Sequence, residues 1–99
     1  MKVLHIGNDV SVPLDEIIMI LNERSAMDAT RDYIVEAKKK RRFINCRGTV
    51  KSFVFVRERG REMVYASPIA SSTLQKRISE ELSYKWLSEV AVFTAILEK

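Results

Sequence analysis

Basic side chains crowd the middle of this sequence. Between Lys38 and Arg61 stand ten basic residues and one acid, Glu58, which gives this segment a net charge of +9. The whole chain carries +4, so the remaining residues together carry −5. The basic residues are Lys38, Lys39, Lys40, Arg41, Arg42, Arg47, Lys51, Arg57, Arg59 and Arg61. Lysine and arginine neutralise phosphates and release the counterions around them, so affinity falls steeply with salt. This segregation of charge predicts an anionic partner for the middle third of the chain.

Two other interpretations compete with phosphate binding. A helix that ends near Lys40 would place cations beside its last carbonyl groups, which explains two or three of them. It does not explain ten cations that continue through a loop, a strand and a hairpin turn. An anionic lipid surface is a further alternative, but a membrane-surface helix carries large apolar residues opposite its cations. The helix expected here is alanine-rich on its apolar side. Nucleic acid is the favoured partner, although charge alone does not separate DNA from RNA.

Residue types that carry catalysis are scarce. One histidine, His5, and one cysteine, Cys46, cannot form a metal site without carboxylates from elsewhere. His5 stands in an apolar segment, where a structural or half-buried role is expected. The basic loop around Cys46 favours a lowered thiol pKa, whereas a lone cysteine is more often a small buried hydrophobic residue. Three glycines are too few for a phosphate-binding glycine loop. We therefore expect no enzyme, no metal, no cofactor and no small-molecule ligand.

Size and composition indicate one small globular domain. The chain has 99 residues, of which 46% are hydrophobic and 30% charged. A core this small gains stability when copies associate, so we expect a homo-oligomer. No signal-peptide pattern opens the chain, and the most apolar stretch, Trp86–Leu97, contains Glu89 and is too short to span a bilayer. A single cysteine excludes an internal disulfide, so we expect a cytoplasmic protein without a membrane partner.

The first half of the chain predicts strands followed by a helix. Residues 2–6 and 10–12 favour two strands joined by a Gly-Asn-Asp turn, as in a hairpin. Residues 16–21 are Ile-rich and apolar on both sides, which favours a buried strand. Residues 26–40 predict one helix, with Ser25 as its N-cap. The apolar stripe of that helix would consist of Ala26, Ala29, Tyr33, Ile34 and Ala37.

The second half predicts a hairpin and more helix. Residues 43–45 favour a brief extended segment, and residues 49–57 alternate as the clearest strand in the chain. The two faces of that strand would carry Val50, Ser52, Val54 and Val56 on one side, and Thr49, Lys51, Phe53 and Phe55 on the other. Arg59-Gly60-Arg61 predicts a hairpin turn to a partner strand over residues 62–66. Arg59 and Arg61 lie at the end of this strand opposite Lys51, so they contact either the same duplex or a different surface.

Helices close the chain. Residues 71–79 favour one helix, and residues 82–97 favour another with an apolar stripe. That stripe contains Leu82, Trp86, Val90, Phe93 and Leu97. It either covers the sheet or binds a second subunit or a partner. The fold class is α+β: a small, mostly antiparallel β-sheet with one central helix and a helical C-terminus. We expect one domain over residues 1–81 and an amphipathic extension over residues 82–99.

Three stretches together resemble a known family. They are HIGNDVSVPLDEIIMIL at residues 5–21, CRGTVKSFVFV at residues 46–56 and YASPIASSTLQKR at residues 65–77. In this order and spacing they resemble the bacterial extracellular matrix regulatory proteins RemA and RemB, closer to the RemB branch, over residues 1–78. The resemblance implies a small regulator of biofilm matrix genes that binds double-stranded DNA. It also implies a LytTR-like fold assembled into rings.

The resemblance carries over to a loop at residues 45–50. In RemA-like proteins arginines of this loop meet the DNA, which makes Arg47 the candidate here, with Lys51 on the strand behind it. RemA-like sequences have Gly-Arg-Arg at this place, whereas this chain has Arg-Gly-Thr and lacks one of the paired arginines. The run Lys38, Lys39, Lys40, Arg41 and Arg42 would compensate by its charge.

Two hypotheses follow. The first is a cytoplasmic, oligomeric DNA-binding transcriptional regulator whose contacts are mainly to phosphates. The second is a non-enzymatic adaptor that docks a partner protein through Leu82, Trp86, Val90 and Phe93. Under the second hypothesis the basic residues serve solubility. Truncation after Glu81 discriminates between them, because it removes the docking helix and leaves the basic surface.

Overall fold

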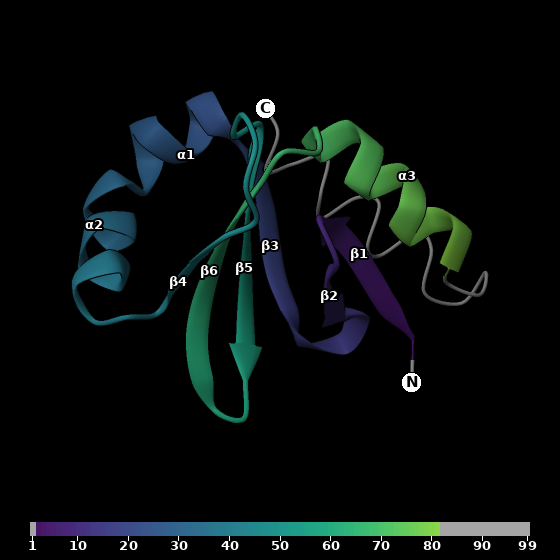
Figure 1. Cartoon of the computed structure of the whole chain (residues 1–99), viewed down its shortest axis with the longest axis horizontal. Helices are drawn as coiled ribbons and strands as arrows, with labels where there is room; N and C mark the ends of the chain where they lie inside the picture. Colours follow the sequence, from purple (N-terminus) through teal and green to yellow (C-terminus); the bar gives the residue numbers. More distant parts are fainter. Residues whose placement is uncertain (1, 82–99) are drawn as a thin grey trace.

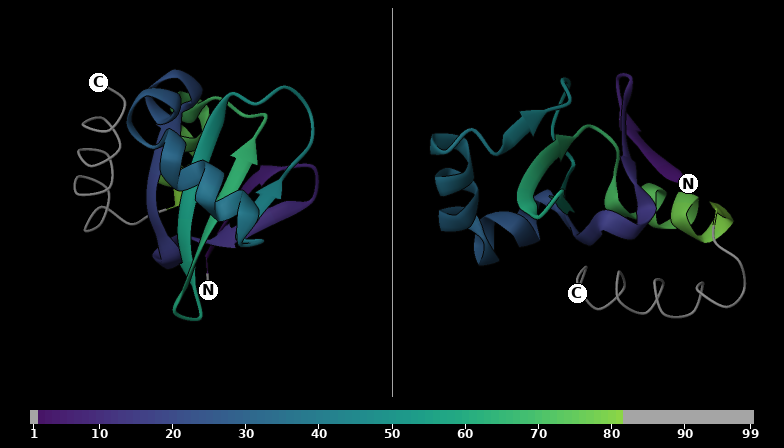
Figure 2. Two further views of the ribbon diagram at one scale, coloured as in Figure 1. Left: turned by 90° about the vertical axis from the view of Figure 1, so that its left-hand side faces the viewer. Right: turned by 90° about the horizontal axis from the view of Figure 1, so that it is seen from below.

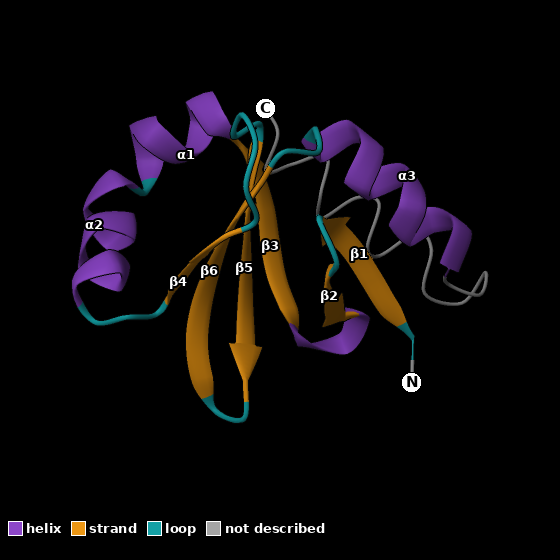
Figure 3. Ribbon diagram, viewed as in Figure 1, coloured by secondary structure: helices purple, strands orange, loops and turns teal. Residues whose placement is uncertain are grey.

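The computed structural model describes residues 2–81, and these residues form six strands, three α-helices and one turn of 3-10 helix. Figure 1 shows their arrangement, and Figure 3 separates helices from strands. The strands are β1 (Val3–Gly7), β2 (Val10–Pro13), β3 (Ile17–Asn22), β4 (Phe43–Asn45), β5 (Ser52–Glu58) and β6 (Arg61–Ser67). The helices are η1 (Leu14–Glu16), α1 (Glu23–Ala29), α2 (Arg31–Lys39) and α3 (Ser71–Glu81).

A four-stranded sheet forms the centre of the fold. Its strand order is β3-β5-β6-β4, and both β3–β5 and β5–β6 are antiparallel. The short strand β4 lies parallel to β6, so one edge of the sheet is mixed. Strands β1 and β2 form a separate antiparallel pair. The predicted α+β class with a mostly antiparallel sheet is confirmed.

The sheet is covered on both faces (Figures 1 and 2). Helices α1 and α2 pack on one face, over a core of Leu21, Ala26, Ile34, Ala37, Phe53, Phe55, Val64 and Ala66. The β1–β2 pair and α3 pack on the other, over a core that includes Leu4, Ile6, Val12, Ile20, Val54, Val56, Leu74 and Ile78. Strand β5 lies between the two cores, and five consecutive residues from Ser52 are buried.

The predicted alternation in β5 holds only inside the strand. Val54 and Val56 face one core while Phe53 and Phe55 face the other, as predicted. The strand begins at Ser52, so the prediction that residues 49–51 belong to it is wrong. Val50 packs beside the phenylalanines instead of with the valines. Residues 47–51 belong to no strand, so the alternation of β5 does not extend to Val50.

The single helix predicted over residues 26–40 is two helices. Asn22 caps the first, because its Oδ1 accepts a 2.8 Å hydrogen bond from the backbone N–H of Ser25. Ser25 is therefore inside α1 and is not its cap. Thr30 separates the helices: its hydroxyl donates to the carbonyl of Ala26, and its φ of −128° leaves the helical region. The bend leaves Ala29 exposed, outside the predicted apolar stripe.

The helix predicted over residues 71–79 is confirmed as α3, which extends to Glu81. The helix predicted over residues 82–97, with Leu82, Trp86, Val90 and Phe93, lies outside the described residues and stays a prediction. Within residues 2–81, none of the helices combines the length and apolar character that crossing a membrane requires.

Candidate nucleic-acid interface

The loop that joins β4 to β5 carries Arg47 and Lys51, and both of its ends are fixed to the end of β6. The N–H of Cys46 donates to the carbonyl of Ala66 at 2.9 Å, and the N–H of Lys51 donates to the carbonyl of Ser67 at 2.8 Å. The Cys46 side chain is buried in the core. These contacts hold the loop, residues 46–51, as a short arch whose exposed middle contains Arg47, Gly48 and Thr49.

Two asparagine side chains fix the backbone around Arg47. Asn8, in the turn between β1 and β2, donates from Nδ2 to the carbonyl of Cys46 at 2.6 Å and to that of Arg47 at 3.4 Å. The β1–β2 turn and the loop project side by side in Figure 2. Asn45 Oδ1 accepts a 2.8 Å hydrogen bond from the N–H of Arg47. Arg47 has a φ of 69°, a left-handed conformation that is uncommon for an arginine.

Gly48 lets the loop lie against Pro68. Its φ is +87°, and a Cβ at this position would come within 3.1 Å of the Pro68 Cβ. Gly7 approaches the same proline, because a Cβ there would lie 2.8 Å from the Pro68 Cδ. Pro68 therefore holds the loop and the β1–β2 turn together, and two of the three glycines in the sequence are placed by this contact.

The cationic groups of the loop are free to bind a ligand. Arg47 and Lys51 are exposed, and neither side chain has a hydrogen-bond or ion-pair partner among residues 2–81. A guanidinium on a fixed backbone can donate two hydrogen bonds to one phosphate. The loop thus combines a preorganised backbone with two unpaired cations, an arrangement that suits an anionic ligand.

The run from Lys38 to Arg42 lies elsewhere. It begins in the last turn of α2 and continues beyond the helix, and β4 stands between it and the loop. Arg42 and Arg47 are therefore joined by up to about 16 Å of extended chain. Lys38 lies over the ring of Phe43, with its Nζ 4.9 Å from the ring centroid. Lys40 pairs with Glu36 at 3.5 Å on the exposed side of α2. Of this run, Lys39 and Arg41 have exposed side chains without a partner among the described residues.

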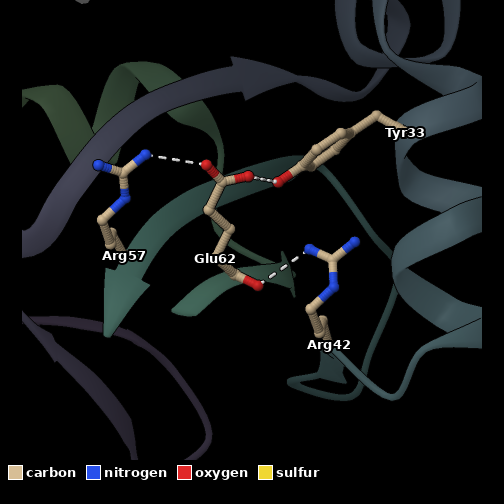
Figure 4. A network of polar contacts seen from close by, with 4 residues as sticks. All are labelled: Tyr33, Arg42, Arg57 and Glu62. Carbon is tan, nitrogen blue, oxygen red and sulfur yellow. Dashed lines mark hydrogen bonds and ion pairs between the residues drawn. The ribbon is translucent and has the colours of Figure 1, made fainter. Parts of the chain in front are cut away.

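Arg42 belongs to a structural network that Figure 4 shows. Its Nη1 donates to the backbone carbonyl of Glu62 at 3.1 Å, and its guanidinium lies over the ring of Tyr33. The Glu62 carboxylate accepts a 2.5 Å hydrogen bond from the Tyr33 hydroxyl and a 2.9 Å one from Arg57. These two donors hold the pKa of Glu62 below its ordinary value, and burial together with Glu62 raises the pKa of Tyr33. The network ties α2 to β5 and β6, so Arg42 and Arg57 are engaged within the protein.

A pocket of about 730 Å³ opens on the α1–α2 side of the sheet. Its apolar lining includes Met19, Met27 and Phe55, and Tyr33 and Glu62 of the network also line it. It contains none of the seven basic residues predicted to bind nucleic acid, so the pocket and the candidate interface are separate features.

The structure settles the surroundings of the two residues considered for catalysis. Cys46 is 1% exposed, and burial raises the pKa of its thiol, so the prediction of a lowered pKa is wrong and that of a small buried residue is confirmed. Of the structural or half-buried role expected for His5, the half-buried alternative is wrong, because its side chain is exposed on the outer face of β1. Its carbonyl accepts a hydrogen bond from Arg77 of α3.

Three residues that position the loop are not among the predicted site residues: Asn8, Asn45 and Pro68. The sequence places Asn8 in a turn, but its partner Cys46 is 38 residues away. Asn45 ends β4 two residues before Arg47, and an asparagine whose side chain accepts from the N–H two residues on is a local signal for a turn. Pro68 marks the end of β6 in the sequence, and its contact with Gly7 and Gly48 has no local signature.

Comparison with known proteins gives one family. No curated protein matches the chain. The family model RemA-like, described as extracellular matrix regulatory protein A-like, matches residues 3–78. The match spans about three quarters of the chain and includes the β1–β2 turn, the loop at residues 46–51 and Pro68. The chain therefore belongs to the RemA-like family.

Proposed function

We propose that this chain is a cytoplasmic, oligomeric DNA-binding regulator of the extracellular matrix type, and that the loop at residues 46–51 contacts DNA phosphates. One observation carries the proposal. Asn8 and Asn45 hold the backbone of Arg47 in a left-handed conformation while its exposed guanidinium has no partner among residues 2–81. A strained, fixed arginine in a loop is expected where a ligand requires that geometry.

Phosphate contacts explain why several copies are needed. A loop with two free cations offers few phosphate contacts. Each contact releases only about one counterion, so a single loop gains little affinity. Copies joined in one assembly present many loops to one duplex, so the second and later contacts form at high effective concentration. Contacts to phosphates position a protein on DNA without specifying sequence. The proposal therefore includes weak base preference and assembly into an oligomer, with a ring as the family resemblance implies.

We further propose that the chain belongs to the RemB branch, as the resemblance implies. Arg47-Gly48-Thr49 stands where RemA-like sequences have Gly-Arg-Arg, so one subunit contributes one loop arginine. Lys51 and the number of copies in the assembly would then supply the remaining charge.

Fluorescence anisotropy with a promoter-length duplex, recorded at several salt concentrations, tests the proposal. Arg47→Asn removes the guanidinium and keeps a residue that tolerates positive φ, unlike alanine. We expect binding by the wild type with a steep negative salt slope, and in the variant a slope smaller by about 0.9 for each phosphate that an Arg47 side chain neutralises. Arg31→Ala removes the same charge at the start of α2 and should leave the slope unchanged. Equal effects of the two variants, or no binding by the wild type at low salt, would contradict the proposal.

A further inference from the structure

A second group of arginines lies at the other end of the sheet, where the β5–β6 hairpin turns. Arg59 and Gly60 form the two-residue turn between the paired residues Glu58 and Arg61. Arg61 donates from Nη2 to the carbonyl of Arg41 at 3.3 Å, which joins the hairpin end to the turn between α2 and β4. We define Arg41, Arg59 and Arg61 as the hairpin-end cluster. All three side chains are exposed.

The acids near this cluster are already engaged. Glu58 accepts a hydrogen bond from the Tyr65 hydroxyl, and Glu62 accepts from Tyr33 and Arg57. Neither carboxylate contacts Arg59 or Arg61, and within residues 2–81 no carboxylate pairs with any guanidinium of the cluster. The charge of the hairpin-end cluster is therefore not neutralised by side chains packed beside it, and it faces solvent.

The turn chemistry supports a role for the charge. Arg59 has a φ of 52° and Gly60 a φ of 78°, the left-handed pair that a two-residue hairpin turn requires. Asparagine, aspartate or glycine suits the first of these positions better than arginine does. Arg41 also has a positive φ, 58°, at the turn after α2. Two turns at this end of the sheet thus carry an arginine where a smaller residue fits the backbone better. The guanidinium groups of both arginines are exposed to solvent.

The hairpin-end cluster is separate from the loop at residues 46–51. Strand β5 runs from one to the other, so Lys51 and Arg59 are about 25 Å apart along the strand. Figure 1 shows the hairpin turn at the bottom of the sheet and the loop at its top. Both faces of the sheet between them are covered by other elements. A short ligand bound at one end cannot reach the other.

We propose that the hairpin-end cluster is a second phosphate-binding surface, which holds a nucleic-acid backbone independently of the loop at residues 46–51. Three guanidiniums on two adjoining turns suit a ligand with phosphates repeated along a chain. The inference extends the proposed DNA-binding function and rests on it for the class of ligand. The two sites are distinguishable because each contains a reporter glycine, Gly60 in the hairpin and Gly48 in the loop.

The test is NMR of the full chain labelled with ¹⁵N at glycine, titrated with a six-base-pair DNA hairpin. The sequence has three glycines, so each amide signal can be assigned by substitution. Six base pairs span about 20 Å, less than the separation of the two sites. We expect both the Gly48 and the Gly60 signals to shift in the wild type. Arg59→Asn with Arg61→Gln should raise the half-saturating DNA concentration at Gly60 about tenfold or more and leave that at Gly48 within about twofold.

The outcomes separate the two proposals. Arg47→Asn should weaken the response at Gly48 and leave the half-saturation at Gly60 unchanged. A shift of the Gly48 signal alone would overturn the second site and support the loop site. A shift of the Gly60 signal alone would support the second site and contradict DNA binding by the loop at residues 46–51. If neither signal shifts, both proposals fail. Titration with inorganic phosphate in place of DNA separates binding of a nucleic-acid backbone from binding of a free anion: an equal response at Gly60 would overturn the assignment to nucleic acid.

Discussion

The side-chain amide of Asn8 lies 2.6 Å from the carbonyl oxygen of Cys46, so the β1–β2 turn is hydrogen-bonded to the backbone that leads into Arg47. Asn8 carries no charge and makes its contact through backbone atoms of the loop. It is a positioning residue: its effect on a ligand passes through the conformation of Arg47.

This relationship predicts that Asn8→Gly weakens DNA binding without changing its salt dependence. Glycine keeps the positive φ of this position, 42°, and removes only the amide. We expect affinity to fall about three- to tenfold, the value of one or two modest hydrogen bonds. The salt slope should stay the same, because the number of phosphate contacts is unchanged. Ser11→Ala, an exposed change in the same hairpin, is the control. A reduced slope would show that Asn8 acts by another route.

The three glycines predict a ranking of stability. All have positive φ, so alanine at any of them is strained by about 1 kcal/mol or more. An added Cβ would meet Pro68 at 2.8 Å from Gly7 and at 3.1 Å from Gly48, and nothing within 4 Å from Gly60. We therefore expect Gly7→Ala to lower the free energy of unfolding most, Gly48→Ala less, and Gly60→Ala least. Urea denaturation followed by circular dichroism measures the order, and Gly60→Ala is the internal control for backbone strain. Equal losses of unfolding free energy in all three variants would mean that Pro68 shifts to accommodate the added Cβ without destabilising the protein.

Local patterns in the sequence predicted what neighbouring residues determine. The alternation of valine and phenylalanine identified β5, and Arg59-Gly60 identified the hairpin turn. The same local reasoning failed at α1, where Ser25 and Asp28 resemble a capping box, but Asn22 provides the cap and Thr30 breaks the helix. Asn22 and Ser25 are both plausible N-caps by residue type, so local sequence alone does not decide which of them begins the helix.

Contacts between distant segments could not be predicted in this way. The sequence of Phe43–Asn45 does not indicate that this segment pairs with β6 in parallel. Parallel partners are not joined by a short turn, so no local pattern marks the pair. For the same reason the charge of the middle third looked continuous in sequence. Folding divides it between two ends of the sheet and engages Arg42 and Arg57 in hydrogen bonds to Glu62. The pocket beside Tyr33 likewise forms from five separate elements, β3, α1, α2, β5 and β6.

The hydrogen bonds of Glu62 should make part of the free energy of unfolding depend on acid pH. Its hydrogen bonds from Tyr33 and then Arg57 hold its pKa below the ordinary 4.5 in the folded protein. The unfolded chain therefore binds more protons in that range. The stability that Glu62 contributes is present above its unfolded pKa and is lost as the pH falls through its folded pKa. We expect the free energy of unfolding to decrease below about pH 4.5, and Glu62→Gln to make this decrease shallower.

Thermal or urea unfolding at a series of pH values from neutral to acid measures this effect. Glu80→Gln is the matched control, because Glu80 is exposed on α3 and its side chain has no partner among the described residues. An acid dependence that Glu62→Gln leaves unaltered would show that the network of Figure 4 does not favour the carboxylate form.

Cys46 offers a chemical probe of the loop. Its thiol is buried and its pKa is raised by burial, so it reacts with a disulfide reagent only when the loop opens. We expect labelling of the native protein at pH 8 to be at least about a hundredfold slower than labelling in urea. If the loop holds DNA, a saturating duplex should slow the reaction further, because opening then also requires release of the phosphate. That additional protection should be smaller in Arg47→Asn and unchanged in Arg31→Ala. Equal protection in the two variants would contradict a contact between Arg47 and the DNA.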